Sequence, residues 1–264
     1  MRTFPIKEPI LVVDIGNTNI VCALYQNGES LWSVRLQSDS KRTADEYYGA
    51  LSCLIRDIAF ESIRYVAMGS VVPELGRVWK HLFTRYSTAI VIEINALSPL
   101  GLQFKVPNPA FIGADLIANA YAAWKIYRQN AIIIDLGTAT TIQVVSSTGL
   151  FDGCIIAPGM KTGALNLFEK ATKISEIELV SPTCLLGTNT QDAVLSGIIY
   201  GHAYMLEAFV TQLKQQYFER SPMVTILCGG LANLIKPILP NADLIDKSLT
   251  LDGLHLALIS LLQA

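Results

Sequence analysis

Blocks of apolar and polar residues follow one another along this chain in an order that predicts alternating strands and helices. Three short runs rich in branched apolar residues come first, and the turn residues Gly16-Asn17 and Asn27-Gly28 separate them, which predicts three hairpin-connected strands. Segments with the 3.6-residue period of amphipathic helices follow, separated by short buried strands. The first half is predicted to hold strands at 11–15, 19–25, 31–36, 65–72 and 89–94, and helices at 43–58, 75–86 and 113–127.

Local signals mark where these helices begin. Thr43, with Glu46 three residues later, has the spacing of a capping box, and Pro73 suits the first turn of the next helix. Between residues 96 and 112, three prolines interrupt any period. This segment is therefore predicted to be an irregular loop.

The pattern restarts in the second half of the chain. Residues 13–18 (Val-Asp-Ile-Gly-Asn-Thr) match residues 134–139 (Ile-Asp-Leu-Gly-Thr-Ala), about 120 residues later. Coincidence between two Asp-x-Gly turns would explain these positions alone, but the strand order and the apolar flanks repeat as well. An internal duplication of an α/β unit is therefore favoured. Strands are predicted on both sides of the turn at 135–138 and at 153–156 and 224–228, with helices at 161–172, 190–217 and 251–262.

Composition narrows the class of protein. The chain is 51% hydrophobic and only 16% charged, which excludes a disordered, highly solvated protein. No run of about 18 apolar residues and no secretion-signal pattern occurs, so neither a membrane span nor a secreted protein is expected. The net charge is −2 and there is no basic tract, so nucleic acid is not an expected partner.

Cysteine and histidine usage bears on compartment and metal binding. The five cysteines are widely spaced and form no C-x-x-C motif, and the three histidines are scattered. This is the pattern of reduced thiols in a cytoplasmic protein, and it gives no reason to expect a zinc site.

Each half of the chain carries an Asp-x-Gly turn at the end of an apolar strand, Asp14-Ile-Gly16 and Asp135-Leu-Gly137. Glycine permits the tight reversal and lets a ligand approach the backbone. A carboxylate at the mouth of an apolar strand is costly to bury alone but finds a partner when it faces a metal-bound phosphate. One such turn is typical of an ordinary hairpin. Two turns in corresponding places indicate a phosphate clamp between two lobes.

Two helix starts carry polar residues with more than one possible role. Gly113-Ala114-Asp115 opens the helix after the proline-rich loop, and Asp115 suits either a helix cap or a general base near a substrate hydroxyl. Gly187-Thr-Asn-Thr190 opens a long helix, where Thr190 suits either a cap or a ligand contact. Gly229-Gly230 follows an apolar strand and is a place where a base or ribose could approach the backbone.

These motifs, in this order, resemble those of type III pantothenate kinase and of its relatives, the Bvg accessory factors. The matching segments begin at Asp14, Gly69, Asn108, Gly113, Asp135, Gly153 and Gly187 and span nearly the whole chain. The resemblance implies an α/β fold of two duplicated ribonuclease-H-like lobes, residues 1–124 and 125–264, with the active site in the cleft between them. This is the architecture of the actin, heat-shock protein and sugar kinase superfamily.

The resemblance also implies an activity and a set of site residues. The activity would be ATP-dependent phosphorylation of pantothenate to 4′-phosphopantothenate, the first step of coenzyme A biosynthesis, with Mg²⁺ and K⁺ or NH₄⁺, in a cytoplasmic homodimer. Asp115 would be the catalytic proton acceptor and Asp135 the metal ligand. ATP would be bound by Asp14, Ile15, Gly16, Asn17, Thr18, Asn19, Ile20, Val21, Gly137 and Thr138. Pantothenate would be bound by Val106, Gly113, Ala114, Asp115, Leu116 and Thr190.

Two positions depart from the family pattern. Leu116 stands where the family's Gly-x-Asp-Arg motif has arginine, and Val106 stands where a tyrosine is usual. The loss of arginine removes a charge-assisted contact to the substrate carboxylate, and Lys105 is the cation nearest in sequence. We therefore expect weaker activity toward pantothenate. Two alternatives stay open: a catalytically weak nucleotide-binding paralogue with a regulatory role, and a kinase for a different small hydroxy compound.

Overall fold

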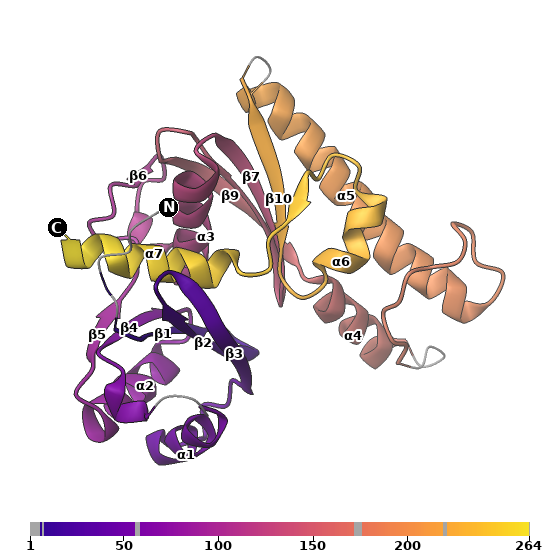
Figure 1. The fold of residues 1–264 in the computed structure, drawn as a ribbon. Helices are drawn as coiled ribbons and strands as arrows, with labels where there is room; N and C mark the ends of the chain where they lie inside the picture. The colour runs from indigo at the N-terminus through magenta and orange to yellow at the C-terminus, as the bar shows by residue number, and fades with distance from the viewer. Residues whose placement is uncertain (1–5, 7, 56–58, 172–175, 219–220, 264) are drawn as a thin grey trace. The chain divides into compact units, whose positions relative to one another are not determined.

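The computed structural model describes residues 6, 8–55, 59–171, 176–218 and 221–263, which fold into two compact units (Figure 1). Unit 1 comprises Met1–Leu102, Pro107–Ala122 and Leu249–Ala264, and unit 2 comprises Gln103–Val106 and Ala123–Ser248. Each unit contains one mixed β-sheet. The predicted helix ends at residues 56–58 and at 172 lie outside the described residues.

The sheet of unit 1 has the order β3-β2-β1-β4-β5. Its strands are β1 (Ile10–Ile15), β2 (Asn19–Gln26), β3 (Glu29–Gln37), β4 (Tyr65–Ser70) and β5 (Ile90–Glu93). β1, β2 and β3 pair antiparallel, while β1, β4 and β5 are parallel. Asn27 and Gly28 both have positive φ, at 53° and 82°, which is the conformation that a two-residue hairpin between twisted strands requires.

Helices pack on both faces of this sheet. The helices are α1 (Ala44–Leu54), α2 (Pro73–Tyr86), most of α3 (Ala114–Tyr127) and α7 (Leu249–Gln263). The buried side chains of α1 and α2, Tyr47 and Trp79 among them, pack with Leu11 and Val13 of β1 in one hydrophobic cluster. α7 packs on β1 and β4, where Leu254 lies against Gly69.

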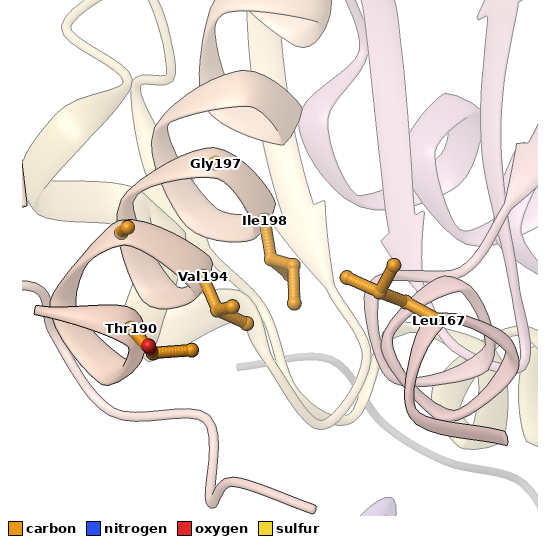
Figure 2. Close-up of a pocket in the computed structure, with 6 residues that line it drawn as sticks. Leu167, Thr190, Val194, Gly197 and Ile198 are labelled. Carbon is orange, nitrogen blue, oxygen red and sulfur yellow. The ribbon is translucent and has the colours of Figure 1, made fainter. Parts of the chain in front are cut away.

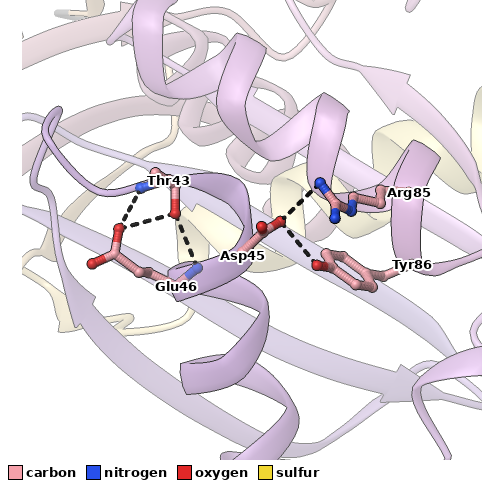
Figure 3. A network of polar contacts seen from close by, with 5 residues as sticks. All are labelled: Thr43, Asp45, Glu46, Arg85 and Tyr86. Atoms are coloured by element: carbon pink, nitrogen blue, oxygen red, sulfur yellow. Dashed lines mark hydrogen bonds and ion pairs between the residues drawn. The ribbon is translucent and has the colours of Figure 1, made fainter.

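A polar network fixes α1 at its start and joins it to α2 (Figure 3). The capping box predicted from Thr43 and Glu46 is present: the Thr43 hydroxyl accepts from the Glu46 amide, and the Glu46 carboxylate accepts from the Thr43 amide. These bonds from Thr43 hold the pKa of Glu46 below its ordinary value. Asp45 accepts from the Tyr86 hydroxyl at 2.9 Å and pairs with Arg85 at 3.4 Å.

The sheet of unit 2 repeats the plan of the first. Its strands are β6 (Gln103–Phe104), β7 (Asn130–Leu136), β8 (Ala139–Val145), β9 (Leu150–Pro158), β10 (Met223–Cys228) and β11 (Leu244–Ile245), in the order β11-β10-β7-β8-β9-β6. β7, β8 and β9 pair antiparallel, while β7, β10 and β11 are parallel. The run β9-β8-β7-β10-β11 therefore corresponds to β3-β2-β1-β4-β5, which confirms the predicted duplication.

One face of this sheet is covered by α4 (Met160–Lys170), α5 (Thr190–Phe218) and α6 (Ala232–Ile235). The sides of α5 that face the sheet bury Leu195, Ile199, Ala203, Leu206 and Val210, which recur every three or four residues. Among the described residues, one helix, Thr190–Tyr217, is long and apolar enough to cross a membrane by length and composition alone. Its periodic burial against the sheet is the pattern of a core helix.

The structure adds short elements that the sequence did not predict. The supposedly irregular segment 96–112 contributes strand β6, which pairs with β9, and a short 3₁₀ turn at Pro109–Phe111. Further 3₁₀ turns lie at Phe60–Ser62 and Lys236–Ile238. The sequence analysis expects two lobes, residues 1–124 and 125–264. The compact units have other bounds, because α7 packs on the sheet of unit 1 and residues 103–106 join unit 2.

Candidate active site

The first Asp-x-Gly turn lies at the carboxyl end of β1. Asp14 pairs in register with Val21 on β2 and with Gly69 on β4. The Gly16 amide donates to the Asn19 carbonyl at 3.0 Å, and the Ser38 hydroxyl donates to the Gly16 carbonyl at 2.6 Å. Asn17 and Thr18 are exposed at the tip. The turn is thus held by backbone bonds and by Ser38, while its tip faces outward.

Asp115 lies in the first turn of helix α3, and its carboxylate folds back over the helix start. Its Oδ1 accepts from the Leu116 amide at 2.8 Å, and a Cβ at Gly113 would collide with the same oxygen. Burial raises the pKa of Asp115 above its ordinary value, although backbone hydrogen bonds from Leu116 and Asp115 lower it in part. A carboxyl group with a raised pKa is a stronger base than an exposed one once ionised, which suits a proton acceptor.

Asp14 and Asp115 belong to the same end and the same face of the unit 1 sheet. Asp14 is the direct partner of Gly69, so the two residues share a face. A Cβ built on Gly69 would lie 3.4 Å from the Cβ of Ala114, the residue before Asp115. Gly113 in turn packs against Val71, one residue beyond β4. The packing therefore brings the two predicted carboxylates of unit 1 to one region.

The second Asp-x-Gly turn is held by contacts from β9 and α4. The carbonyl of Thr138 accepts from the Gly159 amide at 3.1 Å and from the Thr162 hydroxyl at 2.7 Å. A side chain at Gly159 would collide with the Gly137 and Thr138 carbonyls, so only glycine fits there. Gly137 and Thr138 are exposed, as a turn that meets a ligand requires.

Asp135 is the last residue but one of β7, and it packs against Gly229, which directly follows β10. Asp135 pairs in register with Thr141 and with Cys228. Gly229 has φ of +84°, and a Cβ there would lie 2.6 Å from Asp135 Oδ1 and from the Leu136 amide nitrogen. Glycine is thus required at 229 by both its backbone conformation and its closeness to this carboxylate.

The carboxylates of the candidate site would hold a cation only together with oxygen atoms of the substrates. Among the described residues, no group of three or more histidine, cysteine, aspartate or glutamate side chains could hold a metal ion. Asp14 and Asp135 each offer a single carboxylate at the end of a strand. Mg²⁺ is commonly held in this way, by one or two carboxylates together with nucleotide phosphates and water.

The two residues expected to depart from the family pattern, Leu116 and Val106, lie in different units. Leu116 belongs to unit 1 and is only 6% exposed, so its side chain is buried. Val106 is half-buried at the end of the segment that joins unit 2 through β6. Lys105 is exposed, but its Nζ lies 3.4 Å from Asp152 Oδ1, so its charge is engaged in an ion pair.

Thr190 lines a pocket of about 440 Å³ between α4 and α5 (Figure 2). The other lining residues are Leu167, Ala193, Val194, Gly197 and Ile198. Of the two roles that the sequence left open for Thr190, the helix cap is taken by another residue. Asn189 is the cap: its side chain accepts from the Asp192 amide at 2.9 Å and donates to the Asp192 carboxylate at 2.7 Å. The Thr190 hydroxyl is not used in the cap.

Several residues of the site escaped the sequence analysis. Ser38 and Thr162 hold the two turns from positions more than 20 residues away in the chain. No local motif marks either residue, because their role depends on tertiary contacts. Asn189 could have been found, because Asn with Asp three residues later is itself a helix-start pattern.

This fold, two α/β units whose sheets share one strand order, is similar to that of several solved proteins. A conserved Baf family protein from Campylobacter jejuni has a TM-score of 0.61 at 18% identity, covering 96% of this chain and 100% of that chain. The ROK hexokinase from Thermus thermophilus has a TM-score of 0.53 at 14% identity, covering 94% of this chain and 98% of that chain. At these identities the similarity establishes the fold.

Sequence comparison then identifies the family. The sequence model of type III pantothenate kinase matches residues 10–212. The type III pantothenate kinase of Geobacter sulfurreducens is 34% identical over 249 residues, which is 94% of this chain and 97% of that protein. The chain belongs to the type III pantothenate kinase family, and its activity is the ATP-dependent phosphorylation of pantothenate that opens coenzyme A synthesis.

Proposed function

We propose that the two Asp-x-Gly turns bind the ATP phosphates and that Asp115 accepts the proton of the pantothenate hydroxyl. The segments proposed to contact ATP are Asp14–Val21 of unit 1 and Gly137–Thr138 of unit 2, and the tips of both turns are exposed. The observation that carries the proposal is the placement of Asp115, with its raised pKa, at the same sheet end and face as Asp14.

In the proposed reaction, the hydroxyl oxygen of pantothenate forms a bond to the γ-phosphorus of ATP, and the bond from that phosphorus to the β–γ bridging oxygen breaks. The hydroxyl proton passes to an Asp115 carboxylate oxygen, and ADP leaves with the bridging oxygen. Little covalent work falls to the protein, so orienting the two substrates supplies much of the rate.

Two cations complete the proposed site. Asp14 would hold Mg²⁺ together with phosphate oxygens, and Asp135 would hold K⁺ or NH₄⁺. When bound, these ions offset the negative charge on the β- and γ-phosphates. Gly229 supports this role of Asp135, because its closeness restricts where the carboxylate can lie.

On the substrate side, we propose that Val106, Gly113, Ala114, Leu116 and Thr190 form the pantothenate site and that the binding is weaker than in relatives with arginine. Leu116 is buried and neutral, and it offers nothing to a carboxylate. Lys105 is paired with Asp152, so its charge would have to leave that partner to meet the substrate. Both observations favour a raised KM for pantothenate.

We further propose a cytoplasmic homodimer. The five cysteines all lie among the described residues and none of them is in a disulfide, which suits a reducing compartment. α5 exposes a row of small residues, Ala193, Gly197 and Gly201, with Tyr204 at 53% exposure on the same helix. A helix face of this kind suits close packing against a second copy. Gly197→Arg should convert the dimer into monomers, because the long side chain would keep two α5 helices apart. Light scattering measures the mass of the particles in solution. If the variant and wild type both have the mass of a dimer, this interface is wrong.

The assignment of roles is tested by two isosteric variants. Asp14→Asn should weaken productive binding of Mg²⁺–ATP, because one negative ligand is lost. Asp115→Asn should leave ATP binding within about twofold but lower kcat by about a hundredfold or more, since the amide cannot accept the proton. Asp45→Asn is a matched control, because this exposed carboxylate lies in the α1–α2 network. Wild-type turnover in the Asp115 variant would contradict the proposal.

A further inference from the structure

A buried hydrogen bond joins α5 to the second Asp-x-Gly turn. Oγ1 of Thr140 lies 2.9 Å from Nε2 of His202 on α5, and Thr140 is only 1% exposed. Thr140 stands three positions after Gly137 and pairs in register with Leu136 on β7 and Ala157 on β9. The bond therefore ties the strand segment directly behind the turn to the long helix of unit 2.

This contact complements those that hold the turn from the other side. The Thr138 carbonyl is held by the Gly159 amide and by the Thr162 hydroxyl. Those bonds come from the β9–α4 connection and act on the backbone of the turn. His202 acts on the side chain of Thr140 and comes from α5. The segment 137–140 is thus held between two elements, and each fixes a different part of it.

The surroundings of His202 suit a fixed, uncharged imidazole. The side chain lines a pocket of about 300 Å³ whose other walls are glycine, alanine, proline, methionine and isoleucine, Gly159 and Met205 among them. Burial lowers the pKa of His202 below its ordinary value, so the ring is neutral at physiological pH. A neutral imidazole nitrogen can either donate to or accept from the Thr140 hydroxyl. Without it, a buried hydroxyl would lose this partner.

We propose that His202 is a positioning residue for nucleotide binding, acting through Thr140 on the placement of Gly137 and Thr138. The inference rests on the proposed function, in which those two residues contact the ATP phosphates. His202 itself touches no substrate. Removing its hydrogen bond frees Thr140, and displacement of the turn by even a fraction of an ångström weakens the aligned contacts to phosphate.

A purely structural role predicts a different result. If His202 only fills space beneath α5, its loss lowers the melting temperature and leaves the affinity for nucleotide unchanged. If it positions the turn, the affinity for ATP falls while the KM for pantothenate stays constant. The split between these two quantities separates the roles.

The experiment measures the affinity of a non-hydrolysable ATP analogue by calorimetry in the full chain. His202→Leu should weaken it about three- to tenfold, the effect expected for one hydrogen bond. Thr140→Val, which is isosteric, should do the same, and the double variant should be no weaker than the weaker single variant. His202→Gln, whose amide can still reach Thr140, should recover most of the affinity. Met205→Leu is the matched control, because Met205 lines the same pocket and its replacement leaves the hydrogen bond between His202 and Thr140 in place.

Two outcomes would overturn the inference. One is native affinity in both His202→Leu and Thr140→Val, and the other is additive losses in the double variant. Thr138→Glu separates this failure from a failure of the proposed function, because it places a negative charge on the exposed tip of the turn itself. If Thr138→Glu abolishes binding and the His202 variants do not weaken it, the turn binds phosphate but His202 does not position it. If Thr138→Glu also binds normally, the phosphate turn is wrongly assigned.

Discussion

Among single residues, Leu116 and Val106 are the two positions where the sequence analysis expects a departure from the family pattern. Leu116 follows Asp115 directly, donates its amide to that carboxylate and buries its side chain. The backbone at 116 thus serves the proposed general base, whichever side chain the residue carries. In the proposed site, an arginine side chain at 116 would add a cation for the carboxylate of pantothenate, which leucine lacks.

Restoring the missing pair tests this interpretation. Leu116→Arg combined with Val106→Tyr should lower the KM for pantothenate about tenfold, because one charge-assisted contact contributes on the order of 1.5–3 kcal/mol. Leu116→Arg alone should lower the melting temperature, because it places a guanidinium where a buried leucine packs. Initial rates over a range of pantothenate concentrations provide the measurement.

Lys105 provides the control for that experiment. Lys105→Gln should leave the KM for pantothenate unchanged if the ion pair with Asp152 occupies its charge. A low wild-type KM that rises in Lys105→Gln would show that the lysine has replaced the arginine, and our interpretation of the departures would then be wrong.

The raised pKa of Asp115 has a consequence for pH dependence. A base must be ionised to accept a proton, so kcat/KM should fall as the pH drops through a pKa above the ordinary value of 3.8. The sign for stability is the opposite. A carboxyl group whose pKa is raised by folding favours the folded state when protonated, and this contribution is lost as the pH rises through that pKa. Asp115→Asn should therefore be at least as stable as wild type at neutral pH, as is common for variants of strained sites.

At the residue scale, the sequence predicts what depends on local chemistry. The two Asp-x-Gly turns and the capping box at Thr43 could be found, because each is defined by residues a few positions apart. The residues that hold these turns in place could not be found from the sequence. Ser38, Thr162 and His202 act across strands and helices, and nothing in their immediate neighbours indicates this.

Among the elements, α7 has the most distinctive attachment to its sheet. Tyr25 on β2 donates to Asp252 at 2.5 Å, and its ring stacks on His255 with centroids 4.3 Å apart. His255 is 3% exposed, and burial lowers its pKa from 6.5 to about 4. The folded protein therefore keeps this imidazole neutral down to a lower pH than the unfolded chain does.

This shift predicts acid sensitivity of unit 1. As the pH falls, the unfolded chain binds a proton at His255 before the folded protein does. The contribution of neutral His255 to the free energy of unfolding is therefore complete above about pH 6.5. It is lost as the pH falls toward 4, by on the order of 3 kcal/mol. His255→Phe keeps an aromatic ring against Tyr25 and removes the titration, so it should flatten the decline of the melting temperature in this range. His81→Gln, which changes an exposed histidine, should not. Equal pH profiles for wild type and His255→Phe would contradict the account.

At the element scale, long periodic segments were predictable and very short ones were not. The strands from β1 to β5 and the helices α1, α2, α3 and α5 lie within a few residues of their predicted ranges. β6, α6 and β11 have only two to four residues each, which is too few to carry a period. β6 is a strand because β9 offers an edge to pair with, and this depends on the folded sheet.

For the whole molecule, the duplication inferred from two six-residue segments is visible in the matching strand orders of the two sheets. The sequence did not predict that the final helix, α7, belongs to unit 1. Chain order alone does not say on which sheet a helix packs, and α7 packs on β1 and β4 of unit 1.

The repeated turns also predict a cation response that belongs to the whole enzyme. If Asp135 holds a monovalent cation near the phosphates, turnover should rise when K⁺ or NH₄⁺ replaces Na⁺, because Na⁺ is smaller and holds its water more tightly. The Asp135→Asn variant should lose the difference between these buffers. Equal wild-type rates in K⁺, NH₄⁺ and Na⁺ would instead leave Asp135 with a structural or Mg²⁺-linked role.

The most direct test of the account is to follow phosphoryl transfer by ³¹P NMR with the purified chain, Mg²⁺–ATP and pantothenate. We expect a new phosphate monoester signal that requires pantothenate, grows in step with ADP and forms about a hundredfold or more slowly with Asp115→Asn. Saturation should need more pantothenate than in a relative with the arginine. ADP formation that yields only inorganic phosphate, or the same monoester at an undiminished rate from Asp115→Asn, would contradict the account.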